Sequence, residues 1–168
     1  MLVNIPVNGC TVFIHKALIE RVGYFNLNKP HTSDVELFLK LGLLTKPIHL
    51  PLILVKSRSH SEQATFRNRK QHIYESNLFG IDSLKLIPED LLLTSSGLLN
   101  PSEVYKRLAI VWARKGFITA SNEALKYYRS RNRDLSFYLF LRIFCLANYL
   151  YRIGRRKILK IVRNHFQK

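Results

Sequence analysis

The 168-residue chain has the length of about one domain, and its apolar fraction of 47% and charged fraction of 23% are ordinary for a globular protein. This composition excludes a wholly disordered chain, because enough apolar side chains are present to bury a core. The net charge is exceptional, since 27 Lys and Arg against 11 Asp and Glu give +16.

The positive charge is concentrated in the C-terminal part of the chain. Residues 101–168 hold 16 Lys and Arg and 3 acidic residues, a net +13, whereas residues 1–100 hold 11 and 8, a net +3. Such a basic block favours an anionic partner, either nucleic acid or an anionic membrane surface. Cys10 and Cys145 are far apart in the chain and show neither a metal-type spacing nor a disulfide framework, so a reducing, cytoplasmic compartment is expected.

The first half of the chain predicts a mixed α/β layer, in the order strand, helix, helix, strand. The segment CTVFIH (10–15) is short, β-branched and aromatic, which is typical of a strand. The segment KPIHLPLILVKSRSH (46–60) is apolar, β-branched and interrupted by two prolines, and it predicts one or two further strands. Between them, helices are expected over 16–22 and over 34–44.

The second half predicts an all-α segment. Residues 61–84 are expected to form a loop running into a helix, and the Ser, Gly, Asn and Pro around 95–103 mark a domain boundary. We therefore expect two domains, 1–95 with the partial α/β layer and 100–168 with helices only. In the second domain, helices are expected over 101–115, over 119–131 and from Asp134 onward, and the first two should form a helical hairpin.

The third of these helices has two interpretations. The apolar segment 135–151 has 17 residues, fewer than the ~20 that span a membrane, and Arg142 would cost about 2.5–3.5 kcal/mol near a bilayer centre. Aromatic residues followed directly by the basic run RIGRRKILK suit an interfacial helix that binds an anionic membrane surface through 134–163. The alternative is a helix buried in the core of the helical segment.

Asp34 and Glu36 form the first candidate cluster for chemistry, at the start of the helix expected over 34–44. An acid in the first turn of a helix is stabilised by the helix dipole and by free backbone N–H groups. On spacing alone, a structural role with Ser33 or Asp34 as the N-cap is therefore favoured over catalysis. The six histidines are scattered without a zinc motif, and the sequence has no Gly-rich phosphate loop.

Arg58, His60 and Gln63 form the second candidate cluster. They come after the apolar run of the segment expected to be a strand, and residues where a strand enters a loop often line a site. Solvated loop residues fit the same pattern about as well, so the cluster by itself carries no assignment.

Together the two clusters belong to an ordered set of motifs: NGCTVFIHKALIERVGYF, then TSDVELFLKL, then IHLPLILVKSRSHSEQAT. Over about residues 4–66 this set resembles the acceptor-side, C-terminal half of family-2 glycosyltransferases, which have a GT-A-type fold. The resemblance implies that residues 1–95 are the C-terminal part of such a domain. It also implies transfer of a sugar from a nucleotide-sugar donor to a glycan or lipid-linked acceptor.

The resemblance gives each candidate residue an expected role. Asp34 matches the acid that acts as general base and deprotonates the acceptor hydroxyl. Arg58 would lie beside the donor diphosphate, and His60 matches a histidine near the diphosphate and the metal. A divalent metal, Mg²⁺ or Mn²⁺, is the cofactor implied for the complete enzyme. Three residues are expected to support the site: Glu36, Lys40 and Gln63.

The sequence also departs from the pattern of that family. The nucleotide-binding half with its first βαβ units is missing, and so is the Asp-x-Asp pair that would hold the metal against the sugar nucleotide. We therefore expect an enzyme fragment, inactive alone, that is cytoplasmic, with peripheral attachment to the inner face of the membrane as an option. The alternative is a non-enzymatic basic helical module for an anionic membrane surface or nucleic acid. Nucleic acid is the less favoured partner, because no nucleic-acid-binding motif is present.

Overall fold

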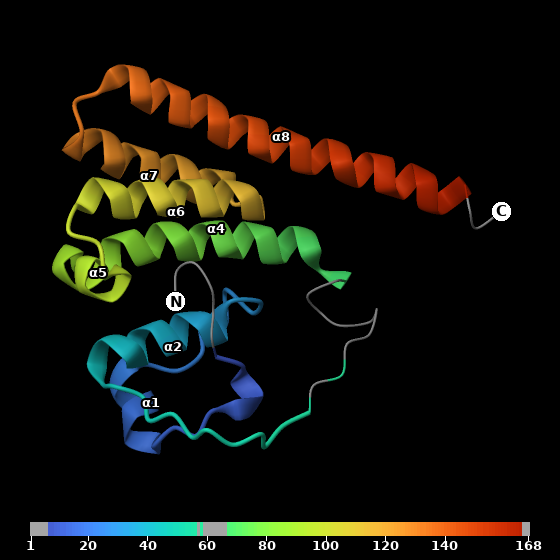
Figure 1. Cartoon of the computed structure of the whole chain (residues 1–168). Coiled ribbons are helices and arrows are strands. Elements are labelled where there is room, and N and C mark those ends of the chain that lie inside the picture. The colour runs from blue at the N-terminus through green and yellow to red at the C-terminus, as the bar shows by residue number, and fades with distance from the viewer. Residues whose placement is uncertain (1–6, 57, 59–66, 166–168) are drawn as a thin grey trace. The chain divides into compact units, whose positions relative to one another are not determined.

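The structure is a computed structural model that describes residues 7–56, 58 and 67–165, with the side chains of α8 described to Tyr151 and at positions 154 and 155. Within these residues there are seven α-helices, one short 3-10 helix and no β-strand. The chain divides into two compact units, Met1–Phe79 (unit 1) and Gly80–Lys168 (unit 2). Figure 1 shows the helices along the chain.

The predicted α/β fold class is wrong, because neither predicted strand forms. Residues 10–15 contain the end of a 3-10 helix, Gly9–Thr11, followed by extended backbone, and 46–56 have no regular secondary structure. Ile48 and Ile53 in this second segment are 90% and 96% exposed. A segment rich in β-branched residues has side chains that fit a half-buried sheet. It becomes a strand only where a neighbouring strand is present to form the backbone hydrogen bonds of the sheet.

Unit 1 contains the helices α1 (Lys16–Val22) and α2 (Ser33–Leu44), which agree with the predicted helices. Gly23 ends α1 with a φ of 83°, in the region that favours glycine. The core of the unit joins the apolar side of α2 to α1 and to the segment before it, through Leu37, Phe38 and Leu41 with Val7, Val12, Ile14, Leu18 and Val22. This packing fixes the start of α2, where the candidate acids lie.

Helix α4 (Arg69–Leu86) contains the boundary between the two units, and α5 (Glu89–Ser96) follows it. The helix predicted toward the end of 61–84 agrees with α4, whereas 61–66 of the predicted loop lie outside the described residues. Helix α5 has no counterpart in the sequence prediction, since its eight residues are too few to show a helical period clearly. The functional domains predicted at 1–95 and 100–168 stay a prediction.

Unit 2 contains α6 (Pro101–Lys115), α7 (Ile118–Arg131) and α8 (Leu135–His165), as the sequence predicts. Asn100 caps α6 by accepting a hydrogen bond from the Ser102 N–H at 2.9 Å, and Gly116 ends it in the left-handed region. Small side chains with no exposed surface allow α6 and α7 to pack closely as a hairpin: Ala109, Ala113, Ala120, Ser121 and Ala124.

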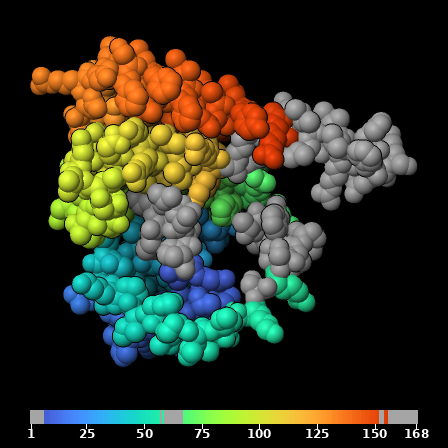
Figure 2. Space-filling view, viewed as in Figure 1, coloured from blue at the N-terminus to red at the C-terminus, as the bar shows by residue number. Residues whose placement is uncertain are grey.

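Helix α8 packs on α6 and α7 along one side. With 31 residues it is about twice as long as either neighbour, and Figure 1 shows it continuing past them. In the view of Figure 2, its described part, orange to red, lies against the yellow α6 on one side and is open on the other. Among the described residues, no helix is long and apolar enough to cross a membrane.

Candidate functional site

Asp34 lies half-buried in the first turn of α2. Thr32 is the N-cap residue, so the prediction of Ser33 or Asp34 as the cap is wrong by one or two positions. The Asp34 Oδ1 atom accepts a hydrogen bond from the Val35 N–H at 2.8 Å. A carboxylate at this place is stabilised by the positive end of the helix dipole and is carried by a rigid element.

Glu75 of α4 anchors the backbone immediately before α2. Its side chain is 1% exposed, and its Oε2 atom accepts hydrogen bonds from the His31 N–H at 2.7 Å and from the Thr32 hydroxyl at 3.5 Å. Its Oε1 atom accepts from the Gln71 side-chain amide at 3.1 Å. The Thr32 side chain makes no cap bond of its own to α2. Glu75 therefore fixes the backbone that leads into the turn carrying Asp34.

His72 of α4 lies within electrostatic range of Asp34 and of a second histidine, His31. Burial lowers the pKa of His72, His31 acts in the same direction, and the carboxylates of Glu75 and Asp34 oppose the shift. A lowered pKa favours the neutral imidazole at neutral pH, the form that can accept a proton. Sequence reasoning misses His72 and Glu75, because they are distant from Asp34 in the chain and no motif links them to it.

Glu36 and Lys40 form an ion pair on the surface of α2, with 3.0 Å between Glu36 Oε1 and Lys40 Nζ. The other carboxylate oxygen of Glu36 accepts hydrogen bonds from Asn26 at 3.2 Å and from Lys29 at 3.4 Å. Burial acts to raise the pKa of Glu36, but these hydrogen bonds and the two lysine charges outweigh it, and the pKa lies below its usual value. The geometry suits a residue that ties the loop before α2 to the helix.

The second predicted cluster is largely outside the described residues. Arg58 is exposed, and its place beside a diphosphate stays a prediction. His60 and Gln63 lie outside the described residues. In the described ranges, no three His, Cys, Asp or Glu side chains are grouped so that they could hold a metal ion. The Mg²⁺ or Mn²⁺ implied by the resemblance stays a prediction for the complete enzyme.

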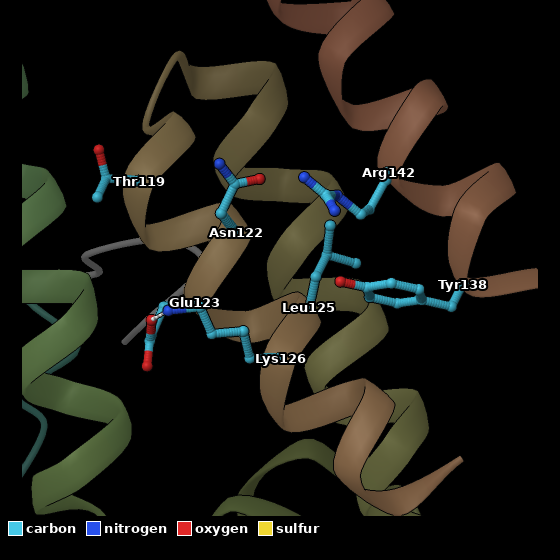
Figure 3. A pocket seen from close by; sticks show the side chains of 7 residues that line it. All are labelled: Thr119, Asn122, Glu123, Leu125, Lys126, Tyr138 and Arg142. Carbon is cyan, nitrogen blue, oxygen red and sulfur yellow. Dashed lines mark hydrogen bonds and ion pairs between the residues drawn. The ribbon is translucent and has the colours of Figure 1, made fainter. Parts of the chain in front are cut away.

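A groove between α7 and α8 is a second candidate for a functional site, separate from the start of α2 (Figure 3). It has a cavity volume of about 350 Å³ and is lined by Thr119, Asn122, Glu123, Leu125, Lys126, Tyr138 and Arg142. Lys126 Nζ lies 2.8 Å from Glu123 Oε2, and the Arg142 guanidinium lies over the Tyr138 ring, 5.9 Å from its centroid. Because Lys126 is compensated by Glu123 and Arg142 stacks on an aromatic ring, we assign no chemistry to the groove.

Comparison with curated proteins gives relatives from the genus Rickettsia. The chain is 34% identical over 85 residues to an uncharacterized glycosyltransferase of Rickettsia felis, a match that covers 50% of this chain and 14% of that protein. It is 32% identical over 92 residues to one from Rickettsia conorii, covering 54% and 15%. It is 23% identical over 124 residues to one from Rickettsia prowazekii, covering 74% and 38%.

No protein-family model and no solved structure matches the chain. The chain spans only about a seventh of the length of the first two of these relatives. Within that limit, the chain is related in sequence to proteins that are named glycosyltransferases.

Proposed function

We propose that this chain supplies the acceptor side of a family-2, GT-A-type glycosyltransferase, and that Asp34 is the general base. The sequence relationship to several proteins named glycosyltransferases is the observation that carries the proposal. The ordered motifs around Asp34 and Arg58 add the family and the role. The donor would be a nucleotide sugar and the acceptor a glycan or a lipid-linked saccharide.

The reaction proposed for Asp34 is a single displacement. Its carboxylate takes the proton of the acceptor hydroxyl, and the hydroxyl oxygen forms a bond to the anomeric carbon of the sugar. The bond from that carbon to the donor phosphate breaks, and its electron pair leaves with the nucleoside diphosphate. A base for this step must come within hydrogen-bond reach of the hydroxyl, and the partial exposure of the Asp34 carboxylate on a rigid helix end supports this role.

The surroundings of Asp34 support a positioning function for its neighbours. Glu75 fixes the turn before α2 through the His31 N–H, and the Glu36–Lys40 pair links the first turn of the same helix to the next. Arg58 is the residue proposed to offset the diphosphate charge. No Asp-x-Asp pair occurs in the 168 residues, so the isolated chain should not turn over a sugar nucleotide.

The experiment places the chain in a relative that carries the remaining parts. The Rickettsia felis relative is made with this chain in place of its own matching segment, and sugar-nucleotide turnover is measured with and without Asp34→Asn. We expect the substitution to lower turnover by about a hundredfold to ten-thousandfold, the usual contribution of a general base. Circular dichroism should show an unchanged helix content.

Asp90→Asn is the matched control, because Asp90 is an exposed acid in the first turn of α5, as Asp34 is an acid in the first turn of α2. It removes the same charge from an equivalent helix position and should leave turnover unchanged. A hybrid protein that transfers sugar equally well with Asn at position 34 would reduce Asp34 to a helix-stabilising residue. Transfer by the purified 168-residue chain alone would contradict the proposal that it supplies only the acceptor side.

A further inference from the structure

Helix α8 exposes a continuous apolar face on the side opposite its packed face. Leu141 and Cys145 are 2% and 1% exposed, whereas Ile143, between them in sequence, is 68% exposed. Residues three or four apart lie on one side of a helix. The exposed face follows this spacing along Leu135, Leu139, Ile143, Leu146 and Leu150, and Phe140 and Tyr151 widen it.

This apolar face belongs to a helix with basic charge only. Residues 135–165 contain seven Lys and Arg and no Asp or Glu, and six of the seven lie within 152–163. The seventh, Arg142, is exposed, and its guanidinium lies over the Tyr138 ring in the groove between α7 and α8. A contiguous exposed apolar surface marks an interaction site in a soluble protein, and the charge selects an anionic partner.

The charge argues against a second copy of this chain as the occupant. Pairing two α8 helices through this face would bring twice seven positive charges together without one acidic residue. Nucleic acid fits the charge but not the apolar face, since aliphatic side chains such as Leu146 and Leu150 have no counterpart on a phosphate backbone. An anionic bilayer surface matches both properties, because headgroups attract the cations and the acyl boundary accepts the apolar side chains.

We propose that α8 docks on an anionic membrane surface, with its exposed apolar face at the boundary between headgroups and acyl chains. The helix would lie in the plane of the surface, consistent with a chain whose described helices are not apolar enough to cross a membrane. The Lys and Arg of 152–163 would lie among the anionic headgroups. This docking does not depend on sugar transfer, so the two proposals can fail separately.

The test is co-sedimentation of the whole chain with vesicles of phosphatidylcholine alone or of phosphatidylcholine mixed with phosphatidylglycerol. The chain should bind the mixed vesicles preferentially, and binding should weaken as salt is added. Ile143→Glu should weaken binding to the mixed vesicles by about tenfold to a hundredfold, the factor that corresponds to loss of one large buried apolar side chain. Leu146→Glu repeats the test at a second position of the face, and circular dichroism establishes that each variant folds.

Leu99→Glu is the matched control, because Leu99 is 99% exposed and lies outside α8. It makes the same change of side chain as Leu146→Glu and the same change of charge as both variants, and it should bind as the wild-type chain does. Equal binding by Ile143→Glu and wild type, or no preference for the anionic vesicles, would overturn the proposal. Two other results would also overturn it. One is a chain that does not bind vesicles but forms a dimer that Ile143→Glu dissociates. The other is binding to duplex DNA that Ile143→Glu weakens by the same factor as it weakens binding to vesicles.

Discussion

Gly80 allows α4 to approach α7 closely within unit 2. A Cβ atom added at Gly80 would lie 2.7 Å from the Ala120 Cβ and 3.5 Å from Trp112 Cζ2. The optimal separation of two carbon atoms is about 3.5–4.0 Å, so the first of these contacts is a clash. Neither Cβ atom can rotate away, because each is fixed to a helix backbone. Gly80→Ala therefore tests how closely the two helices pack.

The sign of the change in the free energy of unfolding distinguishes a packing effect from a helix-propensity effect. Propensity alone predicts that Gly80→Ala stabilises the chain by about 1 kcal/mol, because alanine is the better helix former. Overpacking of a close helix contact costs about 1–3 kcal/mol. The sum is a net loss of about 1 kcal/mol in the free energy of unfolding. The Ala120→Gly variant removes the Cβ atom with which the Cβ atom added by Gly80→Ala would clash. The free energy of unfolding of the double variant should therefore exceed the value expected from adding the two single effects by about 1 kcal/mol or more.

The fluorescence of Trp112 is a suitable probe, since it is the single tryptophan and is 3% exposed in the same contact. Urea unfolding followed by this signal reports on unit 2, and the slope with denaturant shows whether the exposed surface has changed. A Gly80→Ala chain that is more stable than wild type by the full propensity gain would refute the close approach of α4 and α7. Strict additivity in the double-variant cycle would refute it as well.

Two further predictions concern polar contacts. Glu36→Gln should lower the free energy of unfolding by about 1 kcal/mol at neutral pH, measured by circular dichroism. Its folded pKa is lowered from 4.5, so the difference from wild type should shrink as pH falls below that value, and a constant difference would contradict the ion pair. Tyr105→Phe removes the O–H that donates to Glu89 at 2.9 Å and should cost about 1–2 kcal/mol. Burial and Glu89 raise the pKa of Tyr105 from 10.0 to about 12, so wild-type stability should fall as pH rises between these values, and an equal fall in the variant would contradict the assignment.

The helical hairpin is the part of the fold that the sequence predicts well. Its signals are local: Asn100 before Pro101 begins α6, and Gly116 ends it. The α/β layer fails because a strand depends on a partner that is distant in sequence. The β-branched run in 46–60 shows which side chains would suit a sheet, but it does not show whether a sheet is present.

The candidate site also contains some features that the sequence predicts and others that it does not. The position of Asp34 in a first helical turn and the spacing of Glu36 and Lys40 are readable from neighbouring residues. The hydrogen bond from His31 to Glu75 depends on how α4 lies against the start of α2, which is a tertiary contact without a local signal. Buried carboxylates of this kind carry no motif, and only the burial of Glu75 reveals its importance.

The exposed segment after α2 also has a consequence that we expect at high protein concentration. Residues 52–55 (LILV) are all aliphatic, two of them are β-branched, and Ile53 is 96% exposed. Short windows of this composition can pair with the same window of another molecule and start aggregation. Pro51 and Lys56 flank the window, and a proline or a charge at such positions opposes intermolecular pairing. We therefore expect the two flanking residues to oppose aggregation, and their replacement should lower the concentration at which the purified chain begins to aggregate.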